Sequence, residues 1–470
     1  MNVLVLNGSP AGKDSITLFT VRFIERFFPG CTFDVLHVGQ LIKKMERDFS
    51  ESAAALQRAD LILFSYPVYT FLVPAQLHRF VELMKESGLN LSGKYATQIS
   101  TSKHFYDMTA HRFLEENCYD LGLRYLRGLS ADMDDLMTEK GQKQAVDFFS
   151  RVVWSMENGV YERPPKQAPA FSAVPLRESG VLPVGDKKSG KVVVVTDSGA
   201  GDADSAALSA MVDRFCALLP YDTEIVDLQQ FPFKGGCIGC FSCAATGKCF
   251  YKDGFDEYLR SHIQSAEAIV YAYTIKDHSM GYRMKLYDDR QFCNGHRTVT
   301  MGKPVGYLVH GDLWHEPNLR LLMEARAQVG GNYLAGIAGD WGDPDGEILQ
   351  LAKQLSWALE HRYEEPQNFY GMGGLKIFRD LIYQMQGLMK ADHKFYKQHG
   401  FYDFPQKKKG RIVGMYAVGA LMGSEKLRRK AGGKMTEGMT LPYRRILDRA
   451  PALPKRESPE EEPAVAGKKD

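Results

Sequence analysis

The sequence predicts an α/β protein built from two doubly wound, parallel-sheet domains in tandem. Strand patterns alternate with helix patterns from the first residue to about position 160, and the same cycle restarts with the apolar run Lys191–Thr196. Such alternation is typical of a parallel sheet covered by helices on both faces. At 470 residues the chain is also too long for a single core. Together these observations indicate one α/β domain that has been duplicated.

The first domain, 1–160, contains five predicted strands. Short apolar runs mark them, and the intervening segments carry apolar residues at helical spacing. The strands are expected over 3–6, 33–38, 61–64, 95–99 and 123–127, and the helices over 15–28, 74–85, 111–121 and 139–154.

The segment 161–190 is rich in Pro, Gly, Ser and charge without a sustained period, which indicates a linker. The second domain, 191–362, repeats the cycle with a final helix ending near 360. Its strands are expected over 191–196, 223–228, 268–273, 304–309 and 333–337.

Beyond 362 the pattern changes to helices without strands, expected over 375–389 and 412–430. This extension, 363–450, is basic: residues 366–450 hold 17 Lys and Arg against 6 Asp and Glu. We interpret it as a solvated helical extension, the alternative being a surface for an anionic membrane or an acidic partner. The aromatic run 393–404 could cover an active site or simply pack. The last stretch, 451–470, has the composition of a disordered tail.

Overall charge and the N-terminus restrict the function classes. With 59 Lys and Arg against 57 Asp and Glu, nucleic acid is not the expected partner. The chain starts with a strand-like run instead of a secretory signal, and no apolar run is long enough for a transmembrane segment. We therefore expect a cytoplasmic protein.

The turn after the first strand has the composition of a phosphate-binding loop. Backbone N–H groups, hydroxyls and the start of a helix converge there, and the helix dipole favours an anion. A simpler alternative is that Asp14 or Ser15 only caps the helix. The candidate phosphate ligands are Ser9, Pro10, Lys13, Ser15, Ile16 and Thr17.

The turns after the third and fourth strands should lie on the same rim, because ligands bind beyond the carboxyl ends of strands in open α/β sheets. The third strand runs into SYPVYTFLVP, an aromatic and proline turn suited to a flat ring, with Phe71 as a further face residue. For His104 a plain surface position is the alternative. The candidate ring contacts are Tyr66, Pro67, Val68, Tyr69, Thr101, Ser102 and His104.

These motifs resemble the flavodoxin-fold NADPH-dependent FMN reductase family. NGSP followed by Ser and Thr at the helix start, and SYPVY later, occur in the expected order and context. The resemblance implies a flavodoxin-like fold, FMN on this rim and hydride transfer from NAD(P)H to the flavin. Where many members have Asn and Gly before the Thr, this chain has Ser15 and Ile16.

The second domain differs from the first at both turns. Its first turn, 196–205, contains three carboxylates that would repel a phosphate, so flavin binding there is doubtful. After its second strand comes GCIGCFSCAATGKC, a compact loop with CxxCxxCxxxxxC spacing. Zinc sites more often separate two CxxC pairs by a longer insert, whereas thiolates at two-residue gaps suit an iron–sulfur cube. The loop could also hold zinc or be structural.

This loop resembles that of the iron–sulfur flavoproteins. The resemblance implies a 4Fe-4S cluster near FMN, with Cys237, Cys240, Cys243 and Cys249 as the ligands. The scattered Cys31, Cys118, Cys216 and Cys293 are interpreted as ordinary buried thiols.

The sequence therefore predicts an oxidoreductase in which FMN lies in one domain and the metal centre in the other, packed as a pseudo-dimer. NAD(P)H or a reduced carrier such as ferredoxin would exchange electrons with a small-molecule acceptor or a redox protein, and the flavin rather than a side chain would carry the chemistry. A homodimer is possible. Two alternatives are a simple NAD(P)H-dependent FMN or quinone reductase without a cluster, and a non-enzymatic flavin electron carrier or sensor.

Overall fold

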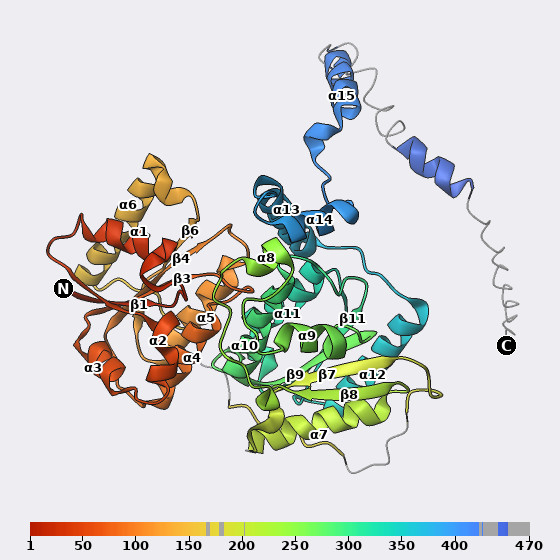
Figure 1. The fold of residues 1–470 in the computed structure, drawn as a ribbon, viewed down its shortest axis with the longest axis horizontal. Coiled ribbons are helices and arrows are strands. Elements are labelled where there is room, and N and C mark those ends of the chain that lie inside the picture. The colour runs from red at the N-terminus through yellow and green to blue at the C-terminus, as the bar shows by residue number, and fades with distance from the viewer. Residues whose placement is uncertain (166–169, 178–182, 202, 423–424, 426–439, 450–470) are drawn as a thin grey trace, which may run out of the picture. The chain divides into compact units, whose positions relative to one another are not determined.

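The computed structural model describes residues 1–165, 170–177, 183–201, 203–422, 425 and 440–449 (Figure 1). The chain forms two compact units, Met1–Phe401 and Tyr402–Asp470. The larger unit contains both sheets. The predicted tail and the end of the helix predicted over 412–430 lie outside the described residues.

The first sheet has the strand order β2-β1-β3-β4-β5, with β6 pairing beside β4, and all of these pairs are parallel. This is the flavodoxin-like order, which confirms the predicted fold class. The strands are β1 Asn2–Asn7, β2 Thr32–Leu36, β3 Leu61–Pro67, β4 Tyr95–Ser102, β5 Arg124–Tyr125 and β6 Leu129–Asp132. The helices are α1 Ile16–Glu25, α2 Val38–Met45, α3 Ser50–Arg58, α4 Ala75–Glu86, α5 Asp107–Asp120 and α6 Glu139–Glu157.

The second sheet repeats this topology in the order β8-β7-β9-β11-β12, with a short antiparallel strand, β10, beside β9. Its strands are β7 Lys191–Thr196, β8 Asp222–Asp227, β9 Ala268–Lys276, β10 Ser279–Met280, β11 Pro304–His310 and β12 Tyr333–Gly339. Its helices are α7 Ala203–Leu218, α8 Ser242–Thr246, α9 Phe255–Tyr258, α10 Tyr282–Arg290, α11 Pro317–Gly330 and α12 Pro344–His361.

The two halves pack through α4 and α10 as a pseudo-symmetric pair. The first N–H of α4, from Ala75, donates to Asp289 Oδ2 of α10 at 2.7 Å, and the first N–H of α10, from Tyr282, donates to Glu82 Oε1 of α4 at 2.7 Å. Each helix thus caps the other with a carboxylate, as an isologous dimer interface would. One buried apolar cluster, which includes Phe80 and Tyr287, runs through both halves.

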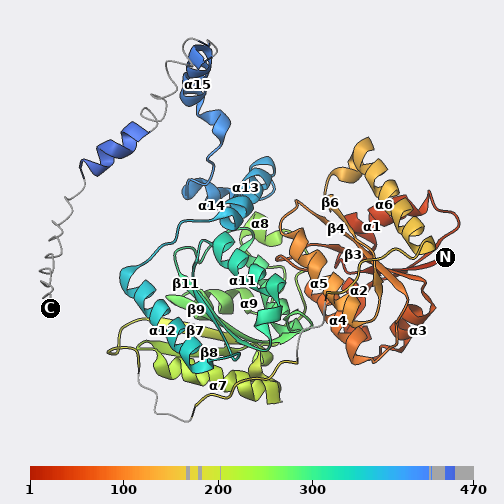
Figure 2. The ribbon, with the colours of Figure 1, turned by 180° about the vertical axis from the view of Figure 1, so that it is seen from behind.

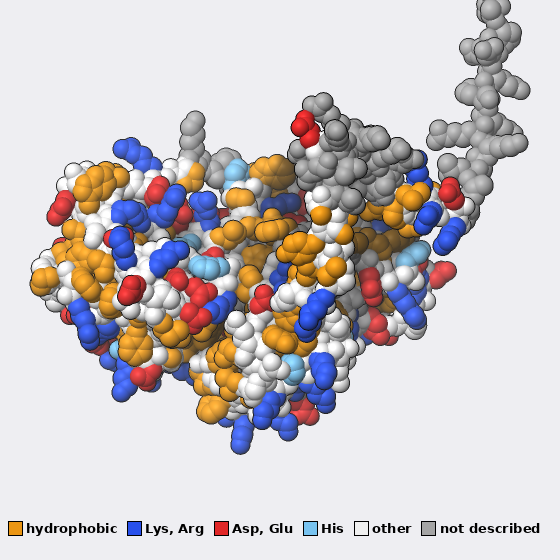
Figure 3. All heavy atoms as spheres, turned by 90° about the horizontal axis from the view of Figure 1, so that it is seen from above, with side chains coloured by type: hydrophobic (Ala, Val, Ile, Leu, Met, Phe, Trp, Pro, Cys, Tyr) orange, Lys and Arg blue, Asp and Glu red, His pale blue; other side chains and the backbone are white. Residues whose placement is uncertain are grey.

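The extension contributes two helices to the larger unit, α13 Phe369–Gln384 and α14 Lys390–Gln398, which replace the single helix predicted over 375–389. They lie beside α11 and α8 in both views (Figures 1 and 2). The smaller unit contains α15 Lys409–Met422. No helix among the described residues has the length and apolar character to cross a membrane. On the face shown in Figure 3, positive and negative side chains are interspersed.

Candidate functional site

One cavity of about 470 Å³ brings the predicted phosphate loop, the aromatic turn and the cysteine loop together. This volume lies in the usual range of cofactor sites. All four predicted metal ligands, Cys237, Cys240, Cys243 and Cys249, line it. So do nine of the predicted flavin residues, namely Ser9, Ser15, Ile16, Thr17, Pro67, Val68, Tyr69, Thr101 and Ser102.

The phosphate loop is shaped by Asn7 at the end of β1. Its Nδ2 donates to the Gly12 carbonyl at 2.8 Å, and its Oδ1 accepts from the Ser9 N–H at 3.2 Å. Ser15 Oγ caps α1 by accepting the Leu18 N–H at 3.4 Å. The Ile16 and Thr17 N–H groups lie in the first helical turn, where no intrahelical acceptor exists. These N–H groups and hydroxyls fit a phosphate, with the helix dipole behind them.

The loop is tied to the end of β4. Thr17 Oγ1 and Thr101 Oγ1 are 2.6 Å apart, and both side chains are buried. This hydrogen bond fixes the distance between the phosphate end of the cavity and the strand end where a ring would lie.

The aromatic turn after β3 has a backbone conformation that non-glycine residues rarely adopt. Thr70 and Phe71 have φ values of 41° and 70°, and Tyr69 and Leu72 exchange hydrogen bonds of 2.8 and 3.0 Å across them. Left-handed backbone at such residues costs about 1–2 kcal/mol each and persists only where other contacts enforce it. Here those contacts come from both halves: Thr109 of α5 donates to the Phe71 carbonyl, and α10 of the second half supplies the rest.

A buried ion pair on α10 holds this turn. Lys285 Nζ donates to the Tyr69 carbonyl at 2.9 Å and to Thr70 Oγ1 at 2.6 Å. Asp289 Oδ1 accepts from Thr70 Oγ1 and from Lys285 Nζ, both at 2.5 Å. Both charged side chains are fully buried, and burial raises the pKa of Asp289 in spite of its cationic partner. Neither residue was predicted from the sequence.

Four predicted flavin residues are absent from the cavity lining: Pro10, Lys13, Tyr66 and His104. Tyr66 is a core residue whose hydroxyl donates to Gln98 Oε1 at 2.5 Å, and burial raises its pKa well above the usual value. His104 is about half exposed, and its Nδ1 lies 2.9 Å from Asp107 Oδ2. The period-2 alternation of a strand explains Tyr66, because neighbouring side chains point to opposite faces.

The cysteine loop follows β8 and includes the short helix α8. The Gly239 N–H lies 3.5 Å from Cys237 Sγ, in the geometry of a donor to sulfur. Burial, with a further contribution from Asp392, raises the pKa of Cys243 to about 11, so a cationic centre would offset the cost of its thiolate. Among the described residues, the one group of three ligand side chains within 4.8 Å of one another is Glu116, His278 and Glu316, which lies outside this loop.

A second buried ion pair supports the cysteine loop from the same helix, α10. Arg290 NH2 lies 2.7 Å from Asp253 Oδ1, and Arg290 NH1 donates to the Gly235 carbonyl at 2.9 Å. Asp253 Oδ2 also accepts the Lys234 N–H at 3.2 Å. Helix α10 therefore holds the aromatic turn with Lys285 and Asp289 and the cysteine loop with Arg290.

The aromatic turn and the cysteine loop are in contact. A Cβ at Gly239, where φ is +65°, would lie 2.1 Å from the Tyr69 hydroxyl, so only glycine fits beside this tyrosine. Gln76 Nε2 of α4 lies 3.5 Å from the Cys237 carbonyl oxygen. Cys293, which we interpreted as an ordinary buried thiol, also lines the cavity beside the loop.

The extension covers part of this cavity. Phe378 and Leu381 of α13 line it, and the Phe378 ring lies 4.2 Å from that of Phe105. On α14, Asp392 Oδ2 lies 3.0 Å from His296 Nδ1, and His296 is another lining residue. The predicted aromatic run contributes Tyr396, whose hydroxyl donates to the His296 carbonyl at 3.2 Å.

At the corresponding rim of the second half, the described residues include buried carboxyl groups and a residue of the linker. Burial raises the pKa of Asp197 to about 7, and the nearby Asp227 adds to the effect. His310 Nδ1 lies 2.5 Å from Asp340 Oδ2, and the ring of the linker residue Phe171 packs 6.1 Å from that of His310. The described residues of this rim thus present carboxyl groups, which disfavour a phosphate when they are ionised.

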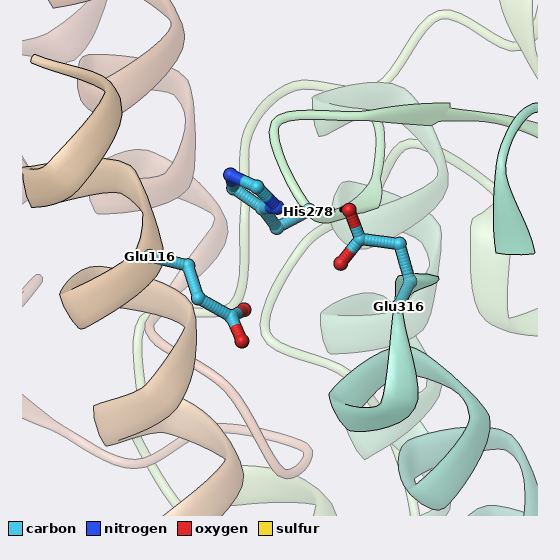
Figure 4. A group of neighbouring side chains, drawn as sticks. All are labelled: Glu116, His278 and Glu316. Atoms are coloured by element: carbon cyan, nitrogen blue, oxygen red, sulfur yellow. Dashed lines mark hydrogen bonds and ion pairs between the residues drawn. The ribbon is translucent and has the colours of Figure 1, made fainter. Parts of the chain in front are cut away.

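The second half has its own left-handed turn, at Asp277 and His278, with φ values of 54° and 64°. Figure 4 shows His278 between Glu116 of α5 and Glu316, which precedes α11. Its Nδ1 lies 2.8 Å from Glu316 Oε1 and its Nε2 2.9 Å from Asp120 Oδ2. Burial opposes the charged ring, but these two hydrogen bonds outweigh it and raise the pKa of His278 to about 10. Since both nitrogens are hydrogen-bonded, the ring acts as an imidazolium between carboxylates.

Comparison with known proteins gives one family match and one curated relative. Residues 1–117 match the model of the NADPH-dependent FMN reductase family. A protein of Archaeoglobus fulgidus described as an iron–sulfur flavoprotein is 29% identical over 174 residues, which covers 35% of this chain and 79% of that protein.

Solved structures of similar fold include the flavoenzyme NAD(P)H:acceptor oxidoreductase FerB of Paracoccus denitrificans. It is 21% identical and covers 33% of this chain and 97% of its own, with a TM-score of 0.29. An FMN-dependent NADH-azoreductase of Bacillus anthracis is 12% identical and covers 32% of this chain and 98% of its own, with a TM-score of 0.27.

Proposed function

We propose that this chain is an FMN-containing oxidoreductase that also carries a 4Fe-4S cluster, since residues 1–117 match the model of the NADPH-dependent FMN reductase family. NAD(P)H or a reduced carrier would supply electrons, and a small molecule or a redox protein would accept them. The observation that carries this proposal is the shared cavity, which the phosphate loop of the first half and all four cysteines of the second half line together.

In this proposal the first half binds FMN. Ser9, Ser15 and Thr17 hydroxyls and the first N–H groups of α1 would hold the phosphate, while Pro67–Tyr69 and Ser102 would border the ring. FMN supplies the exchange between two-electron and one-electron chemistry when bound. The chain's own residues position it and exclude water: Phe105 and Phe378 close one side of the cavity.

The second half would hold the cluster through Cys237, Cys240, Cys243 and Cys249. Thiolates crowded into one glycine-rich loop are the donor set of an iron–sulfur cube, and backbone N–H groups such as that of Gly239 stabilise sulfur. Tyr69 of the aromatic turn and Gly239 of the cysteine loop are in contact. This contact supports a short path for electrons between the proposed FMN and the proposed cluster.

The test is the spectrum of anaerobically purified protein, read beside its iron and sulfide content. We expect flavin bands together with a broad shoulder that dithionite bleaches, at about four iron atoms per chain. Flavin bands without iron would leave the simple NAD(P)H-dependent reductase. Flavin that binds but that neither NADH nor NADPH reduces would favour an electron carrier. A cytoplasmic location remains a prediction.

A further inference from the structure

The smaller unit presents an apolar helix to solvent. We propose that α15 and the basic residues around it dock the chain on an anionic lipid surface. Every described side chain of α15 from Lys409 to Ala420 is exposed. The apolar ones among them include Val413, Met415 and Tyr416, at 67%, 59% and 76% exposure. Several exposed apolar side chains on one helix are typical of an interaction site.

A second helical stretch in the same unit, 440–447, has the same character. Four large apolar side chains are exposed there, and Arg444 and Arg445 lie among them. The apolar residues are Leu441, Tyr443, Ile446 and Leu447. Basic residues precede the apolar part of α15 and lie among the apolar residues of the second stretch. Such segments suit an interface between headgroups and acyl chains, where apolar side chains insert and cations remain outside.

The positive charge of the segment around α15 favours an anionic lipid surface over a second copy of this chain as its binding partner. Residues 402–450 contain 12 Lys and Arg against 4 Asp and Glu, and Lys408, Lys409 and Arg411 stand at the start of α15. Lys408 has a carboxylate partner, Asp403, at 2.8 Å, which leaves the surrounding excess of positive charge in place. Two copies of so basic a segment would repel each other, whereas anionic headgroups attract it by about 1 kcal/mol for each Lys or Arg.

The described length of α15 indicates how this part of the chain would bind. Its fourteen described residues span about 21 Å at 1.5 Å per residue, less than the roughly 30 Å of a bilayer core. The helix would therefore lie in the interface instead of crossing the membrane. This docking is independent of the flavin and of the cluster.

The test is cosedimentation of the full chain with extruded vesicles. We expect binding to vesicles of phosphatidylglycerol and phosphatidylcholine, little binding to phosphatidylcholine alone, and weaker binding at high salt. Replacing two exposed apolar residues, Val413→Asp with Tyr416→Asp, should lower the partition coefficient at least about tenfold. The charge variant Lys408→Glu with Lys409→Glu should lower it about tenfold on anionic vesicles.

The matched control is Met137→Asp, at a 75% exposed apolar residue of the first half, which should bind as the wild type does. Equal binding by the α15 variants and this control would overturn the proposal, as would failure of the wild type to bind anionic vesicles. Light scattering gives a second way to overturn it: a dimer that Val413→Asp with Tyr416→Asp dissociates would assign α15 to a second copy.

Discussion

The two rims of this molecule share a topology but not a chemistry. Both follow a 2-1-3-4-5 sheet, and both carry a left-handed turn, Thr70–Phe71 in the first half and Asp277–His278 in the second. The first rim lines the cavity, while the described residues of the second rim include the carboxyl groups of Asp197 and Asp340 and the linker residue Phe171, whose ring packs beside His310. The difference shows that a sheet provides the place for a site, whereas a few side chains at the strand ends decide whether a ligand can bind there.

Disrupting the buried ion pair Lys285–Asp289, which holds the aromatic turn, should give the largest effect on stability. Asp289→Asn leaves Lys285 as an unpaired buried cation, and we expect a loss of about 3 kcal/mol in the free energy of unfolding, measured by urea denaturation. The double variant Lys285→Met with Asp289→Leu should recover much of this stability while still weakening FMN binding, because the Thr70 turn loses both partners. Full FMN affinity in the double variant would contradict the assigned role of the pair.

Ser15→Asp gives the first rim a carboxylate like those found at the second rim. Aspartate is as good a helix cap as serine, so α1 should persist, but the new charge would repel the phosphate. We expect FMN affinity to fall roughly 100-fold in a fluorescence titration of the apoprotein. Ser15→Asn, an uncharged cap, is the matched control. If the Asp and Asn variants bind FMN equally, the phosphate does not lie at this loop.

The second turn should respond to pH through His278. Its pKa in the folded protein, about 10, lies above the unfolded value of about 6.5. The stabilisation from its imidazolium is thus complete below about pH 6.5 and is lost as pH rises through about 10. Discounting for partial exposure, we expect a loss of about 2 kcal/mol by urea denaturation between pH 6.5 and 10.5. The same pH dependence in His278→Gln would assign it to other groups.

Removing the ring of the linker residue Phe171 should give the smallest effect on stability. Phe171→Ala removes the ring that packs against His310 and Trp341, and we expect a loss of about 1 kcal/mol in unfolding free energy because the side chain is only partly buried. FMN should still bind at one molecule per chain, since Asp197 and Asp340 remain. A second bound FMN, counted by absorbance after denaturation, would mean that the linker alone closes the second rim.

Much of the fold was predictable from the sequence because it rests on local patterns. Each of the main parallel strands was marked by a short apolar run, and the phosphate loop by the composition of residues 7–17. Helices α2 and α3 were missed in the stretch 38–58, although Val38, Ile42 and Met45 lie at helical spacing and form the buried face of α2. Helix α13 begins and ends earlier than its apolar pattern indicated, because its position depends on packing against α11.

The sequence by itself determined the duplicated sheet, the phosphate loop and the spacing of the four cysteines, since each is encoded within a few neighbouring residues. Tertiary structure alone decided that these parts meet in one cavity, that Tyr66 lies in the core, and that Lys285 and Asp289 hold a turn more than 200 positions earlier. The physical reason is that contacts between distant segments depend on how the two halves pack, and no local pattern records that packing.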